Sequence, residues 1–249
     1  MNDAVHNYDL ELAAQLQAAL LPEACPKECE HQRMAARNRM CGSVGGDFYD
    51  FIPINDEQVA FVVGDVVGHG VQAALVMAMI KGFLHADHGN RLRPTEIVAN
   101  LNAMLCHLSD RTTSMTTCSL IYTVLDIPSG SCFLCNAGHA APLLMEPNSF
   151  GAVHLSQHDL LLGIEPFEPT EICHTFKPGE RLVLFTDGIP DALNPEGEFF
   201  GTSRLNTILM DHQHSDADTT ADTVMDAVTA FRRDAEQTDD ETIVILDRL

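Results

Sequence analysis

Hydrophobic and polar positions follow two different periods along the chain, one typical of helices and one typical of strands. Apolar residues recur at helical spacing over 9–21, and we predict further helices at 71–85, at 94–108, after Gly201 and at 218–235. Strand-like runs fall at 33–39, 46–54, 58–64, 115–126, 130–137, 141–146, 171–176, 181–186 and 242–247. Because the strands come in consecutive runs interrupted by helices, the pattern favours antiparallel or mixed sheets with helices on their outer faces.

The first helix is separated from the rest of the chain. Pro22 closes it, and a polar stretch follows over 23–31. We therefore divide the chain into an N-terminal regulatory helix with its linker, residues 1–31, and a main domain, residues 32–249. The apolar stripe of this helix needs a partner, which can be the main domain, a second copy of the chain or an upstream sensor domain.

Composition narrows the class of protein. The 249 residues are 45% hydrophobic, enough for a sizeable core, and the formal net charge is -22. Such a charge argues against nucleic acid and anionic membranes as partners. No run approaches the roughly 18 apolar residues of a membrane span, and the N-terminus does not resemble a signal peptide. We therefore expect a soluble, cytoplasmic protein whose eight cysteines are reduced thiols.

Short acidic motifs recur next to strand-like runs, and these carry the candidate chemistry. They are Gly45-Gly46-Asp47, Gly64-Asp65, Thr186-Asp187-Gly188 and Asp239-Asp240. Aspartates at the ends of buried strands can meet at one end of a sheet, where they repel one another unless cations lie between them. Hard divalent ions prefer such oxygen ligands. The motifs together predict a Mg²⁺ or Mn²⁺ hydrolase.

Other interpretations stay open for the individual motifs. Gly45-Gly46-Asp47 alone is compatible with a bulged turn, and His69 and His139 can act as an acid, as hydrogen-bond donors or as turn residues. Other phosphate chemistries lack their signatures. The chain has no GxxxxGK[ST] loop, no cysteine with an arginine six residues later and no GxSxG elbow.

The order of the motifs resembles that of the metal-dependent protein phosphatases, the type-2C family, and within it the bacterial SpoIIE/RsbU-like branch. The resemblance covers about residues 32–249. It rests on the four acidic motifs and on Asn136-Ala137-Gly138-His139, Leu162-Gly163 and Phe200-Gly201 between or beside them. It implies an α+β fold, a four-layer α-β-β-α sandwich of two antiparallel sheets flanked by helices. It also implies two Mg²⁺ or Mn²⁺ ions between the sheets.

The resemblance assigns ligand roles by motif position. Asp65 would bridge the two ions, and the main-chain carbonyl of Val66 would be a further ligand. Asp187 and Asp239 would complete the shell of one ion. Asp47 would serve the other ion, directly or through water.

Two assignments remain less defined. Asp240 is the alternative to Asp239, because the doublet leaves the register open by one residue. Arg37 stands upstream of the first motif, where the family often has a basic residue, and would hold the phosphate. In the implied mechanism, a water activated by the two ions attacks phosphorus, with no covalent enzyme intermediate.

The implied function is a phosphoserine/phosphothreonine protein phosphatase. In this branch the typical substrate is a phosphorylated STAS-domain antagonist of an anti-sigma factor, within a partner-switching pathway. An upstream sensor or response-regulator domain and a homodimer through the N-terminal helix are the other expected partners. The alternative is a pseudophosphatase scaffold that binds a regulatory protein without catalysis. Hydrolysis of a small phosphoester is a third possibility.

Overall fold

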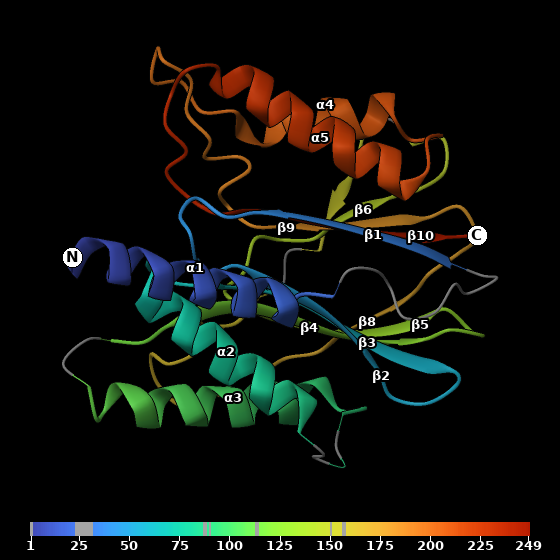
Figure 1. Ribbon diagram of the computed structural model, residues 1–249. Coiled ribbons are helices and arrows are strands. Elements are labelled where there is room, and N and C mark those ends of the chain that lie inside the picture. The colour runs from blue at the N-terminus through green and yellow to red at the C-terminus, as the bar shows by residue number, and fades with distance from the viewer. Residues whose placement is uncertain are drawn as a thin grey trace.

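Two antiparallel sheets lie face to face, and helices cover both outer faces (Figure 1). The computed structural model describes residues 2–22, 32–86, 89, 91–112, 115–149, 151–155 and 158–249. The predicted four-layer α-β-β-α sandwich is confirmed. The predicted linker over 23–31, with Cys25 and Cys29, lies outside the described residues.

The first sheet, called sheet A, carries the C-terminal strands. Its order is β1 (Gln32–Arg39), β10 (Glu241–Arg248), β9 (Arg181–Phe185), β6 (Leu143–Met145) and β7 (Val153–His154). Helices α4 (Gly201–Asp211) and α5 (Ala217–Arg232) cover its outer face (Figure 1). The Asp216 side chain caps α5 by accepting the Thr219 N–H, and Arg233, at φ 50°, follows its last residue.

The second sheet, called sheet B, is built mainly from strands that follow one another in sequence. Its order is β2 (Phe48–Pro53), β3 (Gln58–Val66), β4 (Cys118–Asp126), β5 (Ser131–Ala137) and β8 (Ile172–Thr175). Helices α2 (Val71–His85) and α3 (Pro94–Ser109) cover its outer face (Figure 1).

Alternate residues of the central strands supply two sides of the core. In β3, Val63 joins Ile121 and Val244 in the cluster between the sheets, whereas Val62 faces the helices. Each such fully buried side chain contributes roughly 1.5–3 kcal/mol relative to an exposed one. This interlayer packing fixes which strand ends meet.

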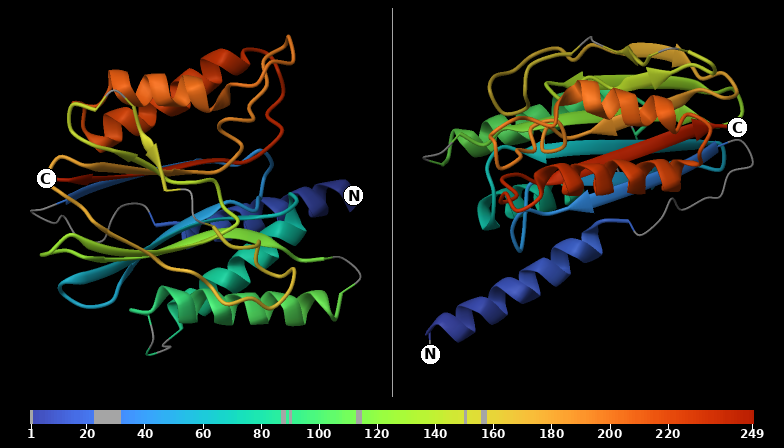
Figure 2. Two further views of the ribbon diagram at one scale, coloured as in Figure 1. Left: turned by 180° about the vertical axis from the view of Figure 1, so that it is seen from behind. Right: turned by 90° about the horizontal axis from the view of Figure 1, so that it is seen from above.

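Helix α1 (Asn2–Leu20) lies beside α2 and extends beyond the sheets (Figure 2). It begins earlier than the hydrophobic pattern predicted. Within the described residues, no helix is both long and apolar enough to cross a membrane. The short strand β7 was not predicted, because a two-residue pairing leaves no period to detect.

Candidate metal centre

The four acidic motifs converge on one end of the sandwich, and they come from both sheets. Asp47 precedes β2 and Asp65 lies near the end of β3. Asp187 follows β9, while Asp239 precedes β10. The register sets Ile243 opposite Phe185, so the residues just before β10 and just after β9 meet at the same edge. The sequence-predicted aspartates are therefore neighbours.

Asp47 is a buried carboxylate that joins the two sheets. It is 1% exposed, and its Oδ2 accepts the Thr186 hydroxyl at 2.7 Å and the Thr242 hydroxyl at 2.6 Å. Each threonine oxygen itself accepts an N–H, from the Thr242 main chain and from Asn38 Nδ2 respectively, so its own proton is directed to Asp47. Burial and the charge of Asp65 raise the pKa of Asp47 well above its ordinary value, and the two hydroxyls oppose that rise.

Asp65 is affected by the charges of three carboxylates from the other motifs. Its pKa rises from 3.8 to about 7, first because of burial and then because of Asp187, Asp239 and Asp240. Burial followed by neighbouring carboxylates also raises the pKa of Asp239, with Asp187, Asp240 and Asp191 as the neighbours. These mutual effects are those of a group of negative charges held together without a counter-ion.

The two aspartates of the last motif have different surroundings. Asp240 Oδ1 accepts the Cys41 N–H at 2.7 Å, and its Oδ2 accepts the N–H groups of Gly46 at 2.8 Å and Asp47 at 3.3 Å. Asp239 Oδ1 accepts the N–H of Asp240 itself. Asp240 thus uses both of its carboxylate oxygens on main-chain donors, whereas Asp239 uses one oxygen on one donor and is exposed.

Two glycines of the motifs are required by close packing. A Cβ on Gly46 would overlap the main-chain oxygen of Val66, so that carbonyl lies against the loop that carries Asp47. A Cβ on Gly188 would overlap the main-chain oxygen of Asp240. The glycines therefore allow the four motifs to approach one another, and they place the Val66 carbonyl among them.

Arg37 does not join the acidic group. Its guanidinium binds Asp222 at 2.6 and 2.9 Å and Asp218 at 3.1 Å, both on α5. Arg37 thus neutralises two aspartates of α5 on the helix-covered face of sheet A. These contacts give no support to the predicted phosphate-binding role. A pattern of residue types could not reveal this, because the partners are about 180 residues away.

The two candidate histidines also differ. His139 is buried, and its Nδ1 shares a 2.6 Å hydrogen bond with Ser119 Oγ, the residue that pairs with Asp65 across β3 and β4. Burial lowers the pKa of His139 from 6.5 to about 4, so the ring is neutral at pH 7. His69 is exposed on the turn before α2. His139 therefore supports the strand that carries Asp65, while His69 makes no comparable contact with the residues that the structure describes.

Sequence reasoning missed a contact that links α1 to the centre. Gln17 is buried, and its side-chain amide donates to the Gly45 carbonyl at 2.7 Å and accepts the Gly45 N–H at 3.0 Å. A polar residue on the inner face of an amphipathic helix was the available signal, since such a residue needs a specific partner.

The residues fit divalent metal ions by donor type and by charge. The group offers carboxylate oxygens and one main-chain carbonyl, which are the ligands that Mg²⁺ and Mn²⁺ take. Among the described residues, no three Asp, Glu, His or Cys side chains already stand at metal-holding distances. Asp47 and Asp240 are buried and Asp65 is half-buried, whereas Asp187 and Asp239 are exposed. The mutual repulsion of these carboxylates is the observation that supports cation binding, since a bound cation relieves it without protonation.

Comparison with known proteins agrees with this architecture. The structure superimposes on the SiaA-PP2C domain of Pseudomonas aeruginosa with a TM-score of 0.83, 21% identity and coverage of 100% of this chain and 99% of that one. It also matches the phosphatase domain and regulatory fragment of Bacillus subtilis SpoIIE with a TM-score of 0.67, 21% identity and coverage of 90% and 64%. These likenesses show a PP2C fold.

Sequence similarity then places the chain in a family. Residues 55–249 match the model of the family described as Stage II sporulation protein E (SpoIIE). The chain belongs to the SpoIIE family. It is 30% identical to Protein IcfG of Synechocystis over 82% of this chain and 36% of that protein. It is 25% identical to Phosphoserine phosphatase RsbU of Bacillus subtilis over 96% of this chain and 70% of that protein. The chain thus spans about a third of IcfG.

Proposed function

We propose that this chain is a metal-dependent serine/threonine protein phosphatase. The observation that carries the proposal is the convergence of Asp47, Asp65, Asp187 and Asp239 at one end of the sandwich, with the pKa of Asp65 raised to about 7. The names of the relatives support it, since RsbU and RsbP of Bacillus subtilis are phosphoserine phosphatases. The solved structure of the PP2C-fold protein PstP contains two manganese ions, and that of RsbX contains magnesium.

The residues of this chain divide the work of holding the ions. Asp65, the Val66 carbonyl, Asp187 and Asp239 would hold one ion, with Asp65 shared between two, and Asp47 would serve the second. Such ions, when bound, polarise the phosphoryl group and make water a better nucleophile at neutral pH. Both threonine hydroxyls donate to Asp47 Oδ2, so they hold the carboxylate in one orientation and partly oppose the rise of its pKa.

The test compares two aspartates of the same domain. Asp187→Asn should abolish Mn²⁺-dependent phosphate release from a phosphoprotein and weaken Mn²⁺ binding in calorimetry. Asp126→Asn, at the far end of β4, should retain both. Absence of both two-site Mn²⁺ binding and phosphate release would indicate the scaffold alternative. Preference for a small aryl phosphate over the phosphoprotein would indicate a small-molecule phosphatase, and full activity in Asp187→Asn would overturn the proposal.

We further propose the substrate class and setting. A phosphorylated STAS-domain protein in a partner-switching pathway is the expected substrate, because it is typical of the branch that the chain resembles, and RsbU and RsbP each match 96% of this chain. Dephosphorylation of a purified phospho-STAS protein, with a phosphorylated peptide of unrelated fold as the control, tests this assignment. Equal turnover of both substrates would remove it.

Regulation through α1 is the final part of the proposal. Tyr8, Leu12, Leu16 and Leu20 are 66%, 47%, 65% and 40% exposed and form a stripe at four-residue spacing. This stripe suits a second copy of the chain, while Gln17 on the inner side contacts the Gly45 main chain. We expect Leu16→Glu to lower the light-scattering mass, and Gln17→Ala to change turnover without changing that mass. If neither value moves, α1 has no such role.

A further inference from the structure

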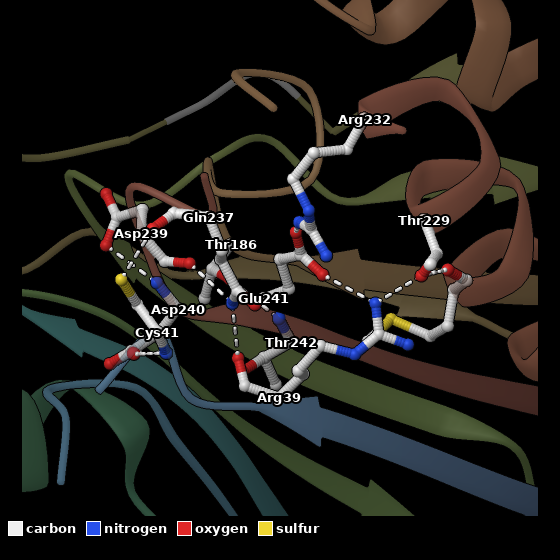
Figure 3. A network of polar contacts seen from close by, with 11 residues as sticks. Arg39, Cys41, Thr186, Thr229, Arg232, Gln237, Asp239, Asp240, Glu241 and Thr242 are labelled. Atoms are coloured by element: carbon white, nitrogen blue, oxygen red, sulfur yellow. Dashed lines mark hydrogen bonds and ion pairs between the residues drawn. The ribbon is translucent and has the colours of Figure 1, made fainter. Parts of the chain in front are cut away.

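Glu241 is a buried carboxylate that the proposed reaction does not use. It is 1% exposed and opens β10 directly after Asp239-Asp240. Two arginines bind it from different elements. Arg39, the last residue of β1 and its cross-strand partner, approaches Oε2 at 3.2 Å, and Arg232, the last residue of α5, binds Oε1 (Figure 3). A carboxylate with two cationic partners inside the protein is a specific arrangement, since burial of a charge is costly without such partners.

Through the two arginines, the start of β10 is linked to α5 and to the loop that precedes β10. Arg39 Nη1 also donates to Thr229 Oγ1 of α5 at 2.5 Å, so β1, β10 and α5 share one polar network (Figure 3). The Gln237 side-chain amide donates to the main-chain oxygens of Arg39 at 3.1 Å and Asp239 at 2.8 Å. The main-chain position of Asp239 is therefore tied to the residues that bind Glu241.

Glu241 lies between two residues whose side chains point to the opposite face of the strand. Asp240 holds the main-chain N–H groups of Gly46 and Asp47, and Thr242 donates to Asp47 Oδ2. Neighbouring residues of a strand face opposite sides, so a side chain anchored behind the sheet fixes the backbone that presents both neighbours in front. This geometry connects α5 to the candidate metal centre through a single residue.

We propose that Glu241, held by Arg39 and Arg232, is a positioning residue that sets the main chain of Asp239, Asp240 and Thr242 for metal binding. The proposal deepens the proposed function and rests on it, because it concerns the same site. Loss of the Glu241 charge leaves Arg39 and Arg232 without their counter-ion, and the main chain at the start of β10 is then held less firmly. Residues behind a metal site commonly change metal affinity about 10-fold to 100-fold when they are replaced.

The experiment pairs Glu241→Gln with Asp247→Asn as a matched control. Asp247 lies six residues later on the same face of β10, where Arg181 donates to it at 2.5 and 2.8 Å, far from the acidic motifs. Both variants remove one arginine-bound carboxylate from one strand. Hydrogen–deuterium exchange without metal should speed up over 41–47 in Glu241→Gln only, because the amides of Cys41, Gly46 and Asp47 depend on Asp240.

Calorimetry supplies the second readout. Glu241→Gln should weaken Mn²⁺ binding by about 10-fold or more, while Asp247→Asn keeps wild-type affinity at a comparable loss of thermal stability. Arg39→Lys, a milder change, should show the same exchange pattern if Glu241→Gln does not fold. Unchanged exchange over 41–47, or equal effects of both carboxylate variants, would overturn the proposal. Absence of Mn²⁺ binding in the wild-type protein would instead refute the proposed function and leave the exchange result valid.

Discussion

Replacing Asp65 by asparagine should make the metal-free protein more stable at alkaline pH, although it removes a predicted catalytic residue. Burial and the charges of Asp187, Asp239 and Asp240 raise the pKa of Asp65 to about 7. The folded state therefore binds the Asp65 proton more tightly than the unfolded chain does. Stability from this group is complete below pH 4 and is lost as the pH rises through 7. Asparagine carries no charge and avoids that loss.

The magnitude follows from the pKa. The rise from 3.8 to about 7 corresponds to a ceiling of about 4 kcal/mol, since one pKa unit is equivalent to about 1.4 kcal/mol. Asp65 is not fully buried, and solvent screening reduces the effect to about 2 kcal/mol. For a protein of this size, about 2 kcal/mol moves the melting temperature by roughly 4–8 °C.

The assay is thermal unfolding in EDTA at pH 5, 6.5 and 8. Asp65→Asn should melt about 4–8 °C above the wild-type protein at pH 8, with the difference shrinking toward pH 5. Added Mn²⁺ should raise the melting temperature of the wild-type protein more than that of the variant. Asp126→Asn is the control of opposite sign, because Ser129 lowers the pKa of Asp126. A variant as stable as the wild-type protein, or less stable, at pH 8 in EDTA would refute the electrostatic account of the centre.

Three further substitutions test other parts of the structure. Asp240→Asn should lower the free energy of unfolding in EDTA by about 2 kcal/mol, because three main-chain donors lose a charged acceptor; a stabilised variant would contradict this role. Lys81→Met should cost about 3 kcal/mol in urea unfolding, since it leaves the buried Asp50, now 2.5 Å from the ammonium, without its cation; wild-type stability would contradict that pairing. Thr242→Val should weaken Mn²⁺ binding about 10-fold in calorimetry, because it removes a hydroxyl that donates to Asp47 Oδ2. Thr123→Val, at a buried hydroxyl with no hydrogen-bond partner among the described residues, is its control, and equal losses would argue against a capping role.

Features that depend on short runs of neighbouring residues could be predicted from the sequence. The apolar runs within 58–64 and 242–247 predicted the strands β3 and β10, and the glycines beside Asp47, Asp65 and Asp187 predicted tight turns. The acidic motifs predicted the grouping of the aspartates, and the family resemblance that they carry implied the four-layer fold. These features depend on a few neighbouring residues, which a single sequence displays.

Contacts between distant segments were not predictable in the same way. Arg37 was predicted to hold the phosphate, and its ion pairs with Asp218 and Asp222 of α5 could not be foreseen from the sequence. The buried Lys81 Nζ donates to the Tyr49 main-chain oxygen at 3.1 Å, and exposed His85 shares a 2.6 Å contact with Asp50. A lysine on a helix is usually solvated, and the burial of Lys81 beside Tyr49 and Asp50 reverses that expectation, whereas His85 remains exposed.

The place of β10 in sheet A has a consequence for how the protein is made. Strand β10 lies between β1 and β9, and its register sets Gln32 opposite Arg248, more than two hundred residues later. Strands β2 to β5 pair in order along the chain, so sheet B can assemble while synthesis continues. In sheet A, β9, β6 and β7 can pair with one another, but β1 must wait for β10. Pairings over such long separations form slowly. A ribosome-bound chain therefore passes through a stage in which β1 is an unpaired edge and Asp47 lacks Thr242, so neither catalysis nor a finished sandwich precedes translation of residues 239–248.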